Sequence, residues 1–435
     1  MNYNRVAVYL CILLLALCGK AVAQTSDTKL SIDINFPGGS GVVQQIDQAR
    51  RMVRITPSRH KDRGWPCWWY VKLSGIKPGE TITLVVTEGF SGRWSRPDRA
   101  AFSTDGKTWK QTPSGRSEGK QTAYRLKIDA AQAWFAWGPP FVPKDAQRLV
   151  DSVAKRSKHA TAFVLCESAA GRPVPALRIK QPGVDDARRV GIWINARQHA
   201  WESGGSWVCR GLTEWLVSDD PRAEALRKKS LITIVPIMDV DNTAIGAGGK
   251  NQTPHDHNRD WAAKPHFKAV ESAIAEIRRQ NAAGRFDLFL DLHNPGPSAQ
   301  RPFFYITPRK LLSPRGRINL DRFLAAAAGE MTGPLTFQGE VHESGDAYDR
   351  NWKKSARTGF RSTPAITSSP SRWKPPGTPR TARPTVISKS DESWDGRSSG
   401  IFAEKREGGW WGSSRTTKLA RSVSEENSGL QARPR

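Results

Sequence analysis

Two kinds of hydrophobic pattern divide the sequence. From Leu30 to about Val142, short runs of alternating apolar and polar residues are separated by turn residues such as Pro78-Gly79 and Asp105-Gly106. Alternation with a period of two is typical of half-buried strands. We therefore expect an antiparallel β-sandwich over residues 25–143, with strands that include Trp68–Val71, Thr81–Val86, Ala101–Ser103 and Tyr124–Ile128.

From about Lys144 the pattern changes to apolar runs that alternate with segments of helical spacing. Such alternation predicts an α/β domain with a mostly parallel mixed sheet covered on both faces, here over residues 144–353. Polar segments follow the predicted strands, and ligands of such sheets bind at the carboxyl ends of the strands. The predicted strands are Val190–Asn195, Leu231–Ile237 and Phe286–Leu292, and the predicted helices are Ser206–Leu216 and Phe267–Arg279.

The last part of the chain, residues 354–435, has no apolar periodicity and is rich in Ser, Arg, Pro and Trp. A segment of this composition cannot bury enough apolar area to offset its ordering entropy. We therefore expect an irregular, disordered tail that does not belong to the preceding fold.

The N-terminus has the features of an export signal. Arg5 precedes an apolar run, Val6–Cys18, and the small residues of Ala21-Val22-Ala23 suit cleavage before Gln24. We expect a signal peptide at residues 1–23 and a periplasmic or secreted mature protein. A lipoprotein signal at Cys18 is a weaker alternative. The apolar run is short for a membrane span, and no later segment is long enough to predict one.

Charge and cysteine content add little about partners. The formal charge is +26, of which the tail from Lys354 carries roughly a third, and the basic residues form no recognised nucleic-acid-binding motif. We expect no nucleic-acid partner, and the sequence assigns no oligomeric state. The mature chain keeps Cys67, Cys166 and Cys209, which allow at most one disulfide. The aromatic residues of the first domain favour core packing over a carbohydrate-binding face.

The candidate chemistry lies after two of the predicted strands. His199 and Glu202 follow the Val190 strand with three-residue spacing, and His293 follows the Phe286 strand. Two neutral imidazoles and one carboxylate leave a fourth position open on Zn²⁺, which is the arrangement of catalytic rather than structural sites. His199, Glu202 and His293 are therefore candidate zinc ligands, although a His-x-x-Glu pair by itself occurs in many proteins.

A polar segment between these histidines contains a candidate carboxylate clamp. Asn258 and Arg259 can grip a carboxylate, the guanidinium with two donors and the amide with one. The neighbouring His255, His257 and Asp260 admit a second metal site, but a role in positioning the Asn258-Arg259 loop is the favoured interpretation.

Taken together, these motifs resemble those of the zinc carboxypeptidase family of the carboxypeptidase A type, and most closely its cytosolic carboxypeptidase-like branch. The resemblance spans roughly Leu30 to Trp352 and includes the N-terminal β-domain of that branch. It rests on these segments, all in family order: Ala196–His199 with Glu202, Ser206-Trp207, Ile234–Met238, Asn258–Trp261 and Asp291–His293.

The resemblance implies that His199, Glu202 and His293 bind zinc, that Asn258 and Arg259 bind the terminal carboxylate of a substrate, and that peptide or protein C-termini are hydrolysed. Two positions depart from the family pattern. Ala200-Trp201 replaces the common Pro-Gly, and Gly249 replaces the oxyanion-stabilising arginine. The adjacent Lys250 is the candidate for that charge, as a point cation without the planar fork.

A hydrolase of this family also needs a general-base glutamate on a later strand, and the chain shows none. When the codons for Arg372 to Ile387 are read one base earlier, permitted choices spell Leu-Glu-Thr-Ala-Trp-Asn-Thr-Pro-His-Ser-Thr-Thr-Asp-Gly-Tyr, which resembles the family's catalytic segment. We infer a frameshift near Lys354 to Gly359, and an inactive or unstable product. The alternatives are a deacylase for N-acyl amino acids and a non-catalytic protein that binds zinc and carboxylates.

Overall fold

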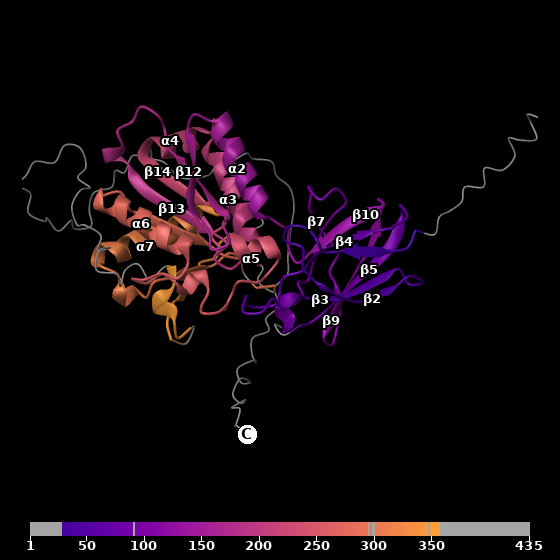
Figure 1. Ribbon diagram of the computed structural model, residues 1–435. Coiled ribbons are helices and arrows are strands. Elements are labelled where there is room, and N and C mark those ends of the chain that lie inside the picture. The colour runs from indigo at the N-terminus through magenta and orange to yellow at the C-terminus, as the bar shows by residue number, and fades with distance from the viewer. Residues whose placement is uncertain are drawn as a thin grey trace, which may run out of the picture.

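The computed structural model of the protein describes residues 28–89, 92–294, 296–297, 301–333, 335–346 and 349–356. The predicted signal peptide at residues 1–23 and the predicted tail beyond residue 356 lie outside these ranges. The described chain forms an N-terminal β-rich part and a C-terminal α/β part, which lie side by side (Figure 1).

The N-terminal part is a sandwich of two five-stranded sheets, with the orders β1-β4-β10-β6-β7 and β2-β3-β5-β9-β8. Neighbouring strands are antiparallel except β3 and β5, which are parallel because the chain adds β4 to the other sheet between them. The strands are β1 Ser31–Asp33, β2 Val42–Asp47, β3 Met52–Thr56, β4 Tyr70–Ser74, β5 Glu80–Thr87, β6 Ala101–Ser103, β7 Lys110–Gln111, β8 Arg116–Glu118, β9 Gln121–Ile128 and β10 Gln132–Ala136.

Alternate side chains of these strands fill the space between the two sheets. Val53 and Ile55 of one sheet and Leu73 and Phe135 of the other are fully buried in a single apolar cluster. Trp69 is also fully buried and donates its indole N–H to the carbonyl of Ser95. These positions confirm the period-two pattern and place Trp69 in the core.

The C-terminal part contains a five-stranded sheet of order β11-β12-β14-β13-β15. Four of its strands point the same way and β12 points the opposite way, because only the pairs β11–β12 and β12–β14 are antiparallel. This is the mixed, mostly parallel sheet that the sequence predicts. Its strands are β11 Ala160–Glu167, β12 Pro173–Ile179, β13 Val190–Ala196, β14 Ser230–Val235 and β15 Leu288–Leu292, and a separate parallel pair comprises β16 Phe304–Ile306 and β17 Val341–Glu343.

Helices cover both faces of this sheet, with α2 and α3 on one side and α6 on the other (Figure 1). The predicted helices are confirmed as α3 and α6, and the predicted strand at Phe286 begins two residues later. The helices are α2 Pro143–Arg156, α3 Ser203–Leu216, α4 Pro221–Lys229, α5 Val240–Ile245, α6 Lys268–Ala282 and α7 Pro314–Glu330; the short 3-10 helices are η1 Gly92–Ser95, η2 Asp186–Arg188, η3 His257–Arg259, η4 Arg309–Leu311 and η5 Trp352–Lys354.

The described chain ends inside the α/β part. Ser355 and Ala356 are fully buried, and the backbone N–H of Trp261 donates to the carbonyl of Lys354. Ordered contacts therefore extend at least three residues beyond the expected boundary at residue 353.

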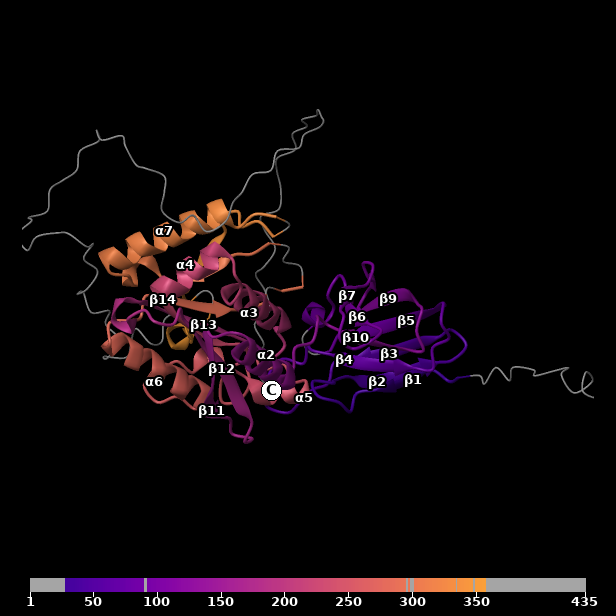
Figure 2. The same cartoon turned by 90° about the horizontal axis from the view of Figure 1, so that it is seen from above.

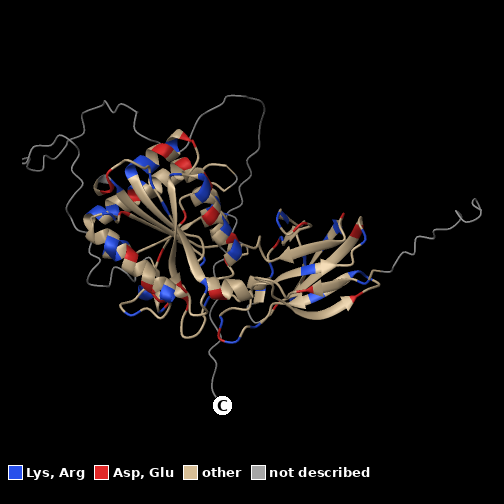
Figure 3. Ribbon diagram, turned by 45° about the horizontal axis from the view of Figure 1, so that its top comes forward, with Lys and Arg blue, Asp and Glu red and all other residues tan. Residues whose placement is uncertain are grey.

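Cys67, Cys166 and Cys209 are all unpaired. Among the residues that the structure describes, no helix has both the length and the apolar character needed to cross a membrane. Lys and Arg are interspersed with Asp and Glu over the helices of the α/β part (Figure 3).

Candidate metal centre

The first two candidate ligands lie in the turn between β13 and α3. All residues of β13 after the first are buried, and the chain turns at Arg197, whose φ of 61° is left-handed. His199 lies in this turn and Glu202 directly precedes α3. Their exposed fractions are 2% and 4%. The buried strand and the helix start thus fix the backbone that carries both side chains.

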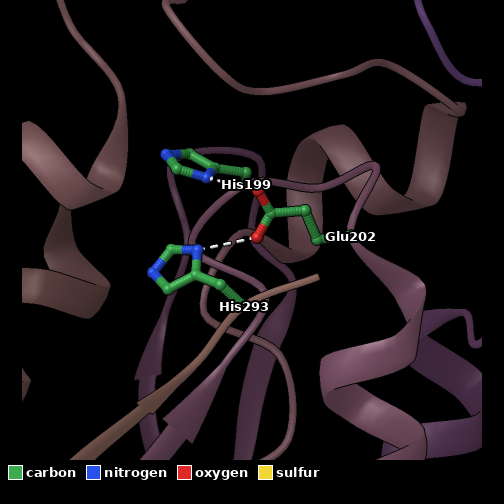
Figure 4. A group of neighbouring side chains, drawn as sticks. All are labelled: His199, Glu202 and His293. Atoms are coloured by element: carbon green, nitrogen blue, oxygen red, sulfur yellow. Dashed lines mark hydrogen bonds and ion pairs between the residues drawn. The ribbon is translucent and has the colours of Figure 1, made fainter. Parts of the chain in front are cut away.

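The third candidate ligand, His293, lies one residue beyond β15. Because β15 runs parallel to β13, the carboxyl ends of the two strands meet at one edge of the sheet. His199 Nδ1 lies 2.8 Å from Oε1 of Glu202, and His293 Nδ1 lies 2.7 Å from Oε2 (Figure 4). Ligand atoms of the three residues lie within 4.8 Å of one another, which is the one such grouping among the described residues.

This donor set fits a zinc ion. Burial raises the pKa of Glu202, but the two histidines outweigh it and hold that pKa well below its usual range. Burial lowers the pKa of His293, but Asp291 and Glu202 outweigh it and raise the pKa to about 10. Without a metal, the carboxylates therefore favour the protonated form of His293, a positive charge that zinc would replace. Two imidazoles with one carboxylate are the ligands of an open zinc site.

Two further acidic residues lie on the far side of the imidazoles from Glu202. Asp291 lies 2.8 Å from Nε2 of His293, and it also accepts hydrogen bonds from Asn195 and Gln198. Asp256 lies 3.5 Å from Nε2 of His199. Carboxylates in such positions orient metal-binding histidines. Sequence reasoning assigned no role to either residue, although Asp291 stands two positions before His293.

The predicted carboxylate clamp borders the same site. Asn258 lies 3.2 Å from Nε2 of His293, and its side-chain oxygen accepts the N–H of Ala356. Arg259 is 4% exposed and binds the carboxylate of Asp349 through Nε and Nη2, each at 2.9 Å. Arg259 therefore holds an internal carboxylate with two donors, both of which reach Oδ2 of Asp349.

Lys250, the candidate oxyanion-stabilising residue, lies on a loop that contacts the β-sandwich. Its carbonyl accepts the N–H of Trp65, and its ammonium lies 5.3 Å from the centroid of the Trp65 ring. Burial opposes ionisation of Asp349, but Arg259 and, more weakly, Lys250 outweigh it and lower the pKa of Asp349. Lys250 thus adds positive potential to the cavity that contains the clamp.

His255, His257 and Asp260 brace the clamp loop instead of converging on one point. His255 Nε2 lies 2.5 Å from Asp260, which also accepts the backbone N–H groups of His266 and Phe267. The ring of His257 stacks on Phe267 at 3.9 Å. These contacts tie the loop to the start of α6, which supports the positioning role.

Comparison with known proteins identifies a protein family that the α/β part of the chain resembles. Residues 147–359 match the family model described as zinc carboxypeptidase, and this range contains the three candidate ligands and the clamp. This part of the chain resembles the zinc carboxypeptidase family.

Individual relatives are distant. An uncharacterized protein of Zymomonas mobilis is 28% identical over 270 residues, which cover 61% of this chain and 67% of that protein. Cytosolic carboxypeptidase 2 of Xenopus tropicalis is 28% identical over 52% of this chain, and that of Danio rerio is 24% identical over 52%. The chain spans only 26% and 35% of those two proteins.

Solved structures share the zinc carboxypeptidase fold. A metallo-carboxypeptidase from Burkholderia cenocepacia has a TM-score of 0.62 at 22% identity and covers 75% of this chain and 85% of its own. A metallo-carboxypeptidase from Pseudomonas aeruginosa, in complex with (2-guanidinoethylmercapto)succinic acid, has a TM-score of 0.60 at 22% identity, with 72% and 82% covered.

Trp201 joins the ligand turn of the zinc carboxypeptidase domain to the β-sandwich. Its ring packs edge-on against Trp137 at 4.9 Å and Trp94 at 6.2 Å, and it belongs to the apolar cluster of the sandwich. It is 2% exposed. Trp201 stands where the family commonly has glycine, and its large side chain packs into the core of the neighbouring domain.

The cavity at the zinc carboxypeptidase site offers no carboxylate without a partner among the described residues. Four acidic side chains line it. Glu202 and Asp291 hold the histidines, Asp349 binds Arg259, and Asp287 accepts the N–H of Gly191. Within the described ranges, then, each acidic group near the metal centre already has a structural role.

Proposed function

We propose that this protein is built as a zinc-dependent carboxypeptidase that removes C-terminal residues from peptides or proteins. One observation carries the proposal: the triad and an arginine that grips a carboxylate line the same cavity. A substrate whose terminal carboxylate replaces Asp349 on Arg259 would lie beside the triad, because Asn258 contacts both His293 and Arg259.

Each residue of the site has its own role in the proposed reaction. His199, Glu202 and His293 would hold a zinc ion, which would supply polarisation of the scissile carbonyl and a more acidic bound water molecule. Asn258 and Arg259 fix the terminal carboxylate, and Lys250 contributes positive charge near the developing oxyanion. Hydrolysis adds the water oxygen to the acyl carbon and breaks the C–N bond. A group must therefore take a proton from the water and pass it to the departing amine.

We infer that this proton acceptor is encoded in the other reading frame. Each acidic side chain in the described cavity has another role, as shown above. The match to the family model ends at residue 359, inside the interval in which the sequence predicts the frame change. The chain as translated is then a carboxypeptidase scaffold that binds zinc and carboxylates but turns over little or no substrate. Sequencing the gene over this interval tests the inference, which fails if the other frame lacks Leu-Glu-Thr.

We also propose that the protein acts outside the cytoplasm. The support is the basic, apolar and small-residue order of its first 23 residues. A mature N-terminus at Gln24 in an exported fraction is the expected result of N-terminal sequencing, and an intact N-terminus would contradict it.

The decisive experiment measures zinc-dependent release of C-terminal amino acids from a peptide library. It compares this chain, a frame-restored version, and a frame-restored version whose new glutamate is replaced by glutamine. We expect release only from the frame-restored protein with glutamate, and loss of release when zinc is chelated.

Other outcomes of this experiment would support a different function for the protein. Release of acyl groups from N-acyl amino acids, with no cleavage of peptides, would indicate a deacylase. Binding of zinc and carboxylates without turnover by any folded version would indicate a non-catalytic binding protein.

A further inference from the structure

Arg197 is a buried arginine near the junction of the two domains. Its exposed fraction is 2%, and an arginine side chain stays protonated in proteins. It donates hydrogen bonds to the carbonyls of Phe141 and Ala200 and to the hydroxyl of Thr243. All three acceptors are neutral. Among the described residues, therefore, this buried charge has no anion in hydrogen-bond contact.

Three carboxylates interact with this charge from a distance, and each is already bound to other groups. Glu202 contacts both histidines of the triad. Asp239 accepts two hydrogen bonds from the first turn of α5, and Asp145 accepts a backbone N–H at the start of α2. A buried charge without a paired opposite charge costs stability. A small anion in contact with Arg197 would reduce that cost.

A cavity borders the guanidinium. Arg197 and Thr243 line it, and the N–H at Nε of Arg197 has no hydrogen-bond partner within the described ranges. The hydroxyl of Thr243 accepts a bond from Arg197, and its own proton can rotate toward a guest. The wall of the cavity thus supplies two hydrogen-bond donors beside a fixed positive charge.

The position and size of this cavity limit its occupant. Gly38 and Trp68 of the β-sandwich line it together with residues of the α/β part, and α5, which carries Thr243, lies beside the β-sandwich in both views (Figures 1 and 2). The centre of a water-sized sphere can move within about 10 Å³ of this space. That is room for one water molecule or one monatomic ion, but not for a sulfate or a phosphate.

We propose that this cavity is a binding site for a single chloride ion, held by Arg197 and Thr243 at the junction of the two domains. A water molecule would fill the space without balancing the buried charge, whereas a halide accepts both hydrogen bonds and attracts the guanidinium. Because Arg197 also binds the carbonyl of Ala200, the ion stabilises the turn between β13 and α3. The site depends neither on the proposed reaction nor on a bound metal.

The test follows thermal unfolding of the full chain while sodium chloride or sodium bromide replaces sodium gluconate at constant ionic strength. Arg197→Met removes the charge, and Thr243→Val removes the hydroxyl without changing the charge. Arg189→Met is the matched control, because Arg189 is also buried but lies 3.0 Å from the carboxylate of Asp186. Crystals of the chain grown with bromide locate the ion by anomalous scattering.

We expect both halides to raise the melting temperature until the site is saturated, by roughly 2–4 °C at tenfold excess over the dissociation constant. Arg197→Met should abolish this rise, Thr243→Val should weaken halide binding roughly tenfold, and Arg189→Met should leave the rise unchanged. Bromide should give an anomalous peak in contact with Nε of Arg197.

The opposite results are equally clear. A rise of the same size in Arg197→Met overturns the site, because the halide then acts elsewhere on the protein. A water molecule in place of bromide beside Arg197 overturns it as well. If Arg197→Met does not fold, Thr243→Val decides, and halide binding as strong as in the unaltered chain overturns the proposal.

Discussion

At the residue scale, the metal centre depends on carboxylates that touch the imidazoles and do not belong to the triad. Asp291 and Asp256 face the Nε2 atoms of His293 and His199, so the Nδ1 atoms point to Glu202. Without a partner of fixed charge on the far side, each ring has more freedom to turn away from the metal position.

The role of Asp256 can be measured directly. We expect Asp256→Asn to weaken zinc binding by roughly 10- to 100-fold, because it removes the charge behind His199. Zinc affinity is measured by competition with a chelator. Asp151→Asn, an exposed aspartate on α2, is the matched control and should leave the affinity unchanged. Equal affinities for Asp256→Asn and the unaltered protein would show that His199 needs no such support.

At the element scale, α3 must approach β15 closely for Glu202 to reach His293. A Cβ at Gly205 would lie 2.6 Å from the carbonyl oxygen of Leu292, a distance that backbone atoms do not tolerate. A Cβ at Gly211, two turns along the same helix, meets nothing within 4 Å. The glycine near the ligands is therefore a packing requirement, and the other is not.

This contrast predicts opposite effects on one helix. Gly205→Ala should push α3 from β15, lowering both the urea midpoint of unfolding and the zinc affinity. Gly211→Ala should raise the stability by about 0.5–1 kcal/mol, because alanine is the better helix former. Both variants are compared by urea unfolding and chelator competition. An unchanged zinc affinity for a folded Gly205→Ala protein would contradict the packing argument.

At the scale of the whole molecule, the β-sandwich supports the segments that carry the metal centre. Trp201 enters the apolar cluster of the sandwich, and its backbone N–H donates to the carbonyl of Gly248 on the loop that carries Lys250. The N–H of Gly249 in turn donates to the carbonyl of Arg63 in the sandwich. The ligand turn and the Lys250 loop are thus both held against the first domain.

Removing this anchor should damage two properties together. We expect Trp201→Ala to destabilise the protein by about 3–5 kcal/mol, through a cavity between the domains, and to weaken zinc binding as the ligand turn loosens. Trp201→Phe keeps a ring against Trp137 and should retain most of both properties. Urea unfolding and chelator competition test this. A loss of stability with unchanged zinc affinity would show that the turn between β13 and α3 keeps its conformation without Trp201.

Local pattern predicted much of this molecule. The strand ahead of His199, the strand ahead of His293 and the helix at residues 268–282 follow from periodicity, because burial of one face imposes a period on the chain. The resemblance of its motifs to the family placed five residues in one site, and the structure brings them together: His199, Glu202, His293, Asn258 and Arg259. Sequence reasoning did not identify Asp256 as a residue of the site. Its partner His199 is 57 positions away in the chain, and the residues next to Asp256 are polar as well.

What the sequence determined is the type of each element and the chemistry of each side chain, since both depend on residues near in the chain. Only the tertiary structure decided which distant groups meet. Strand order is set by packing between segments far apart in sequence, and that order places β15 beside β13, so that His293 meets Glu202. Likewise, Trp201 lies in the core of the other domain because the two domains fold against each other, a contact to which no local spacing corresponds.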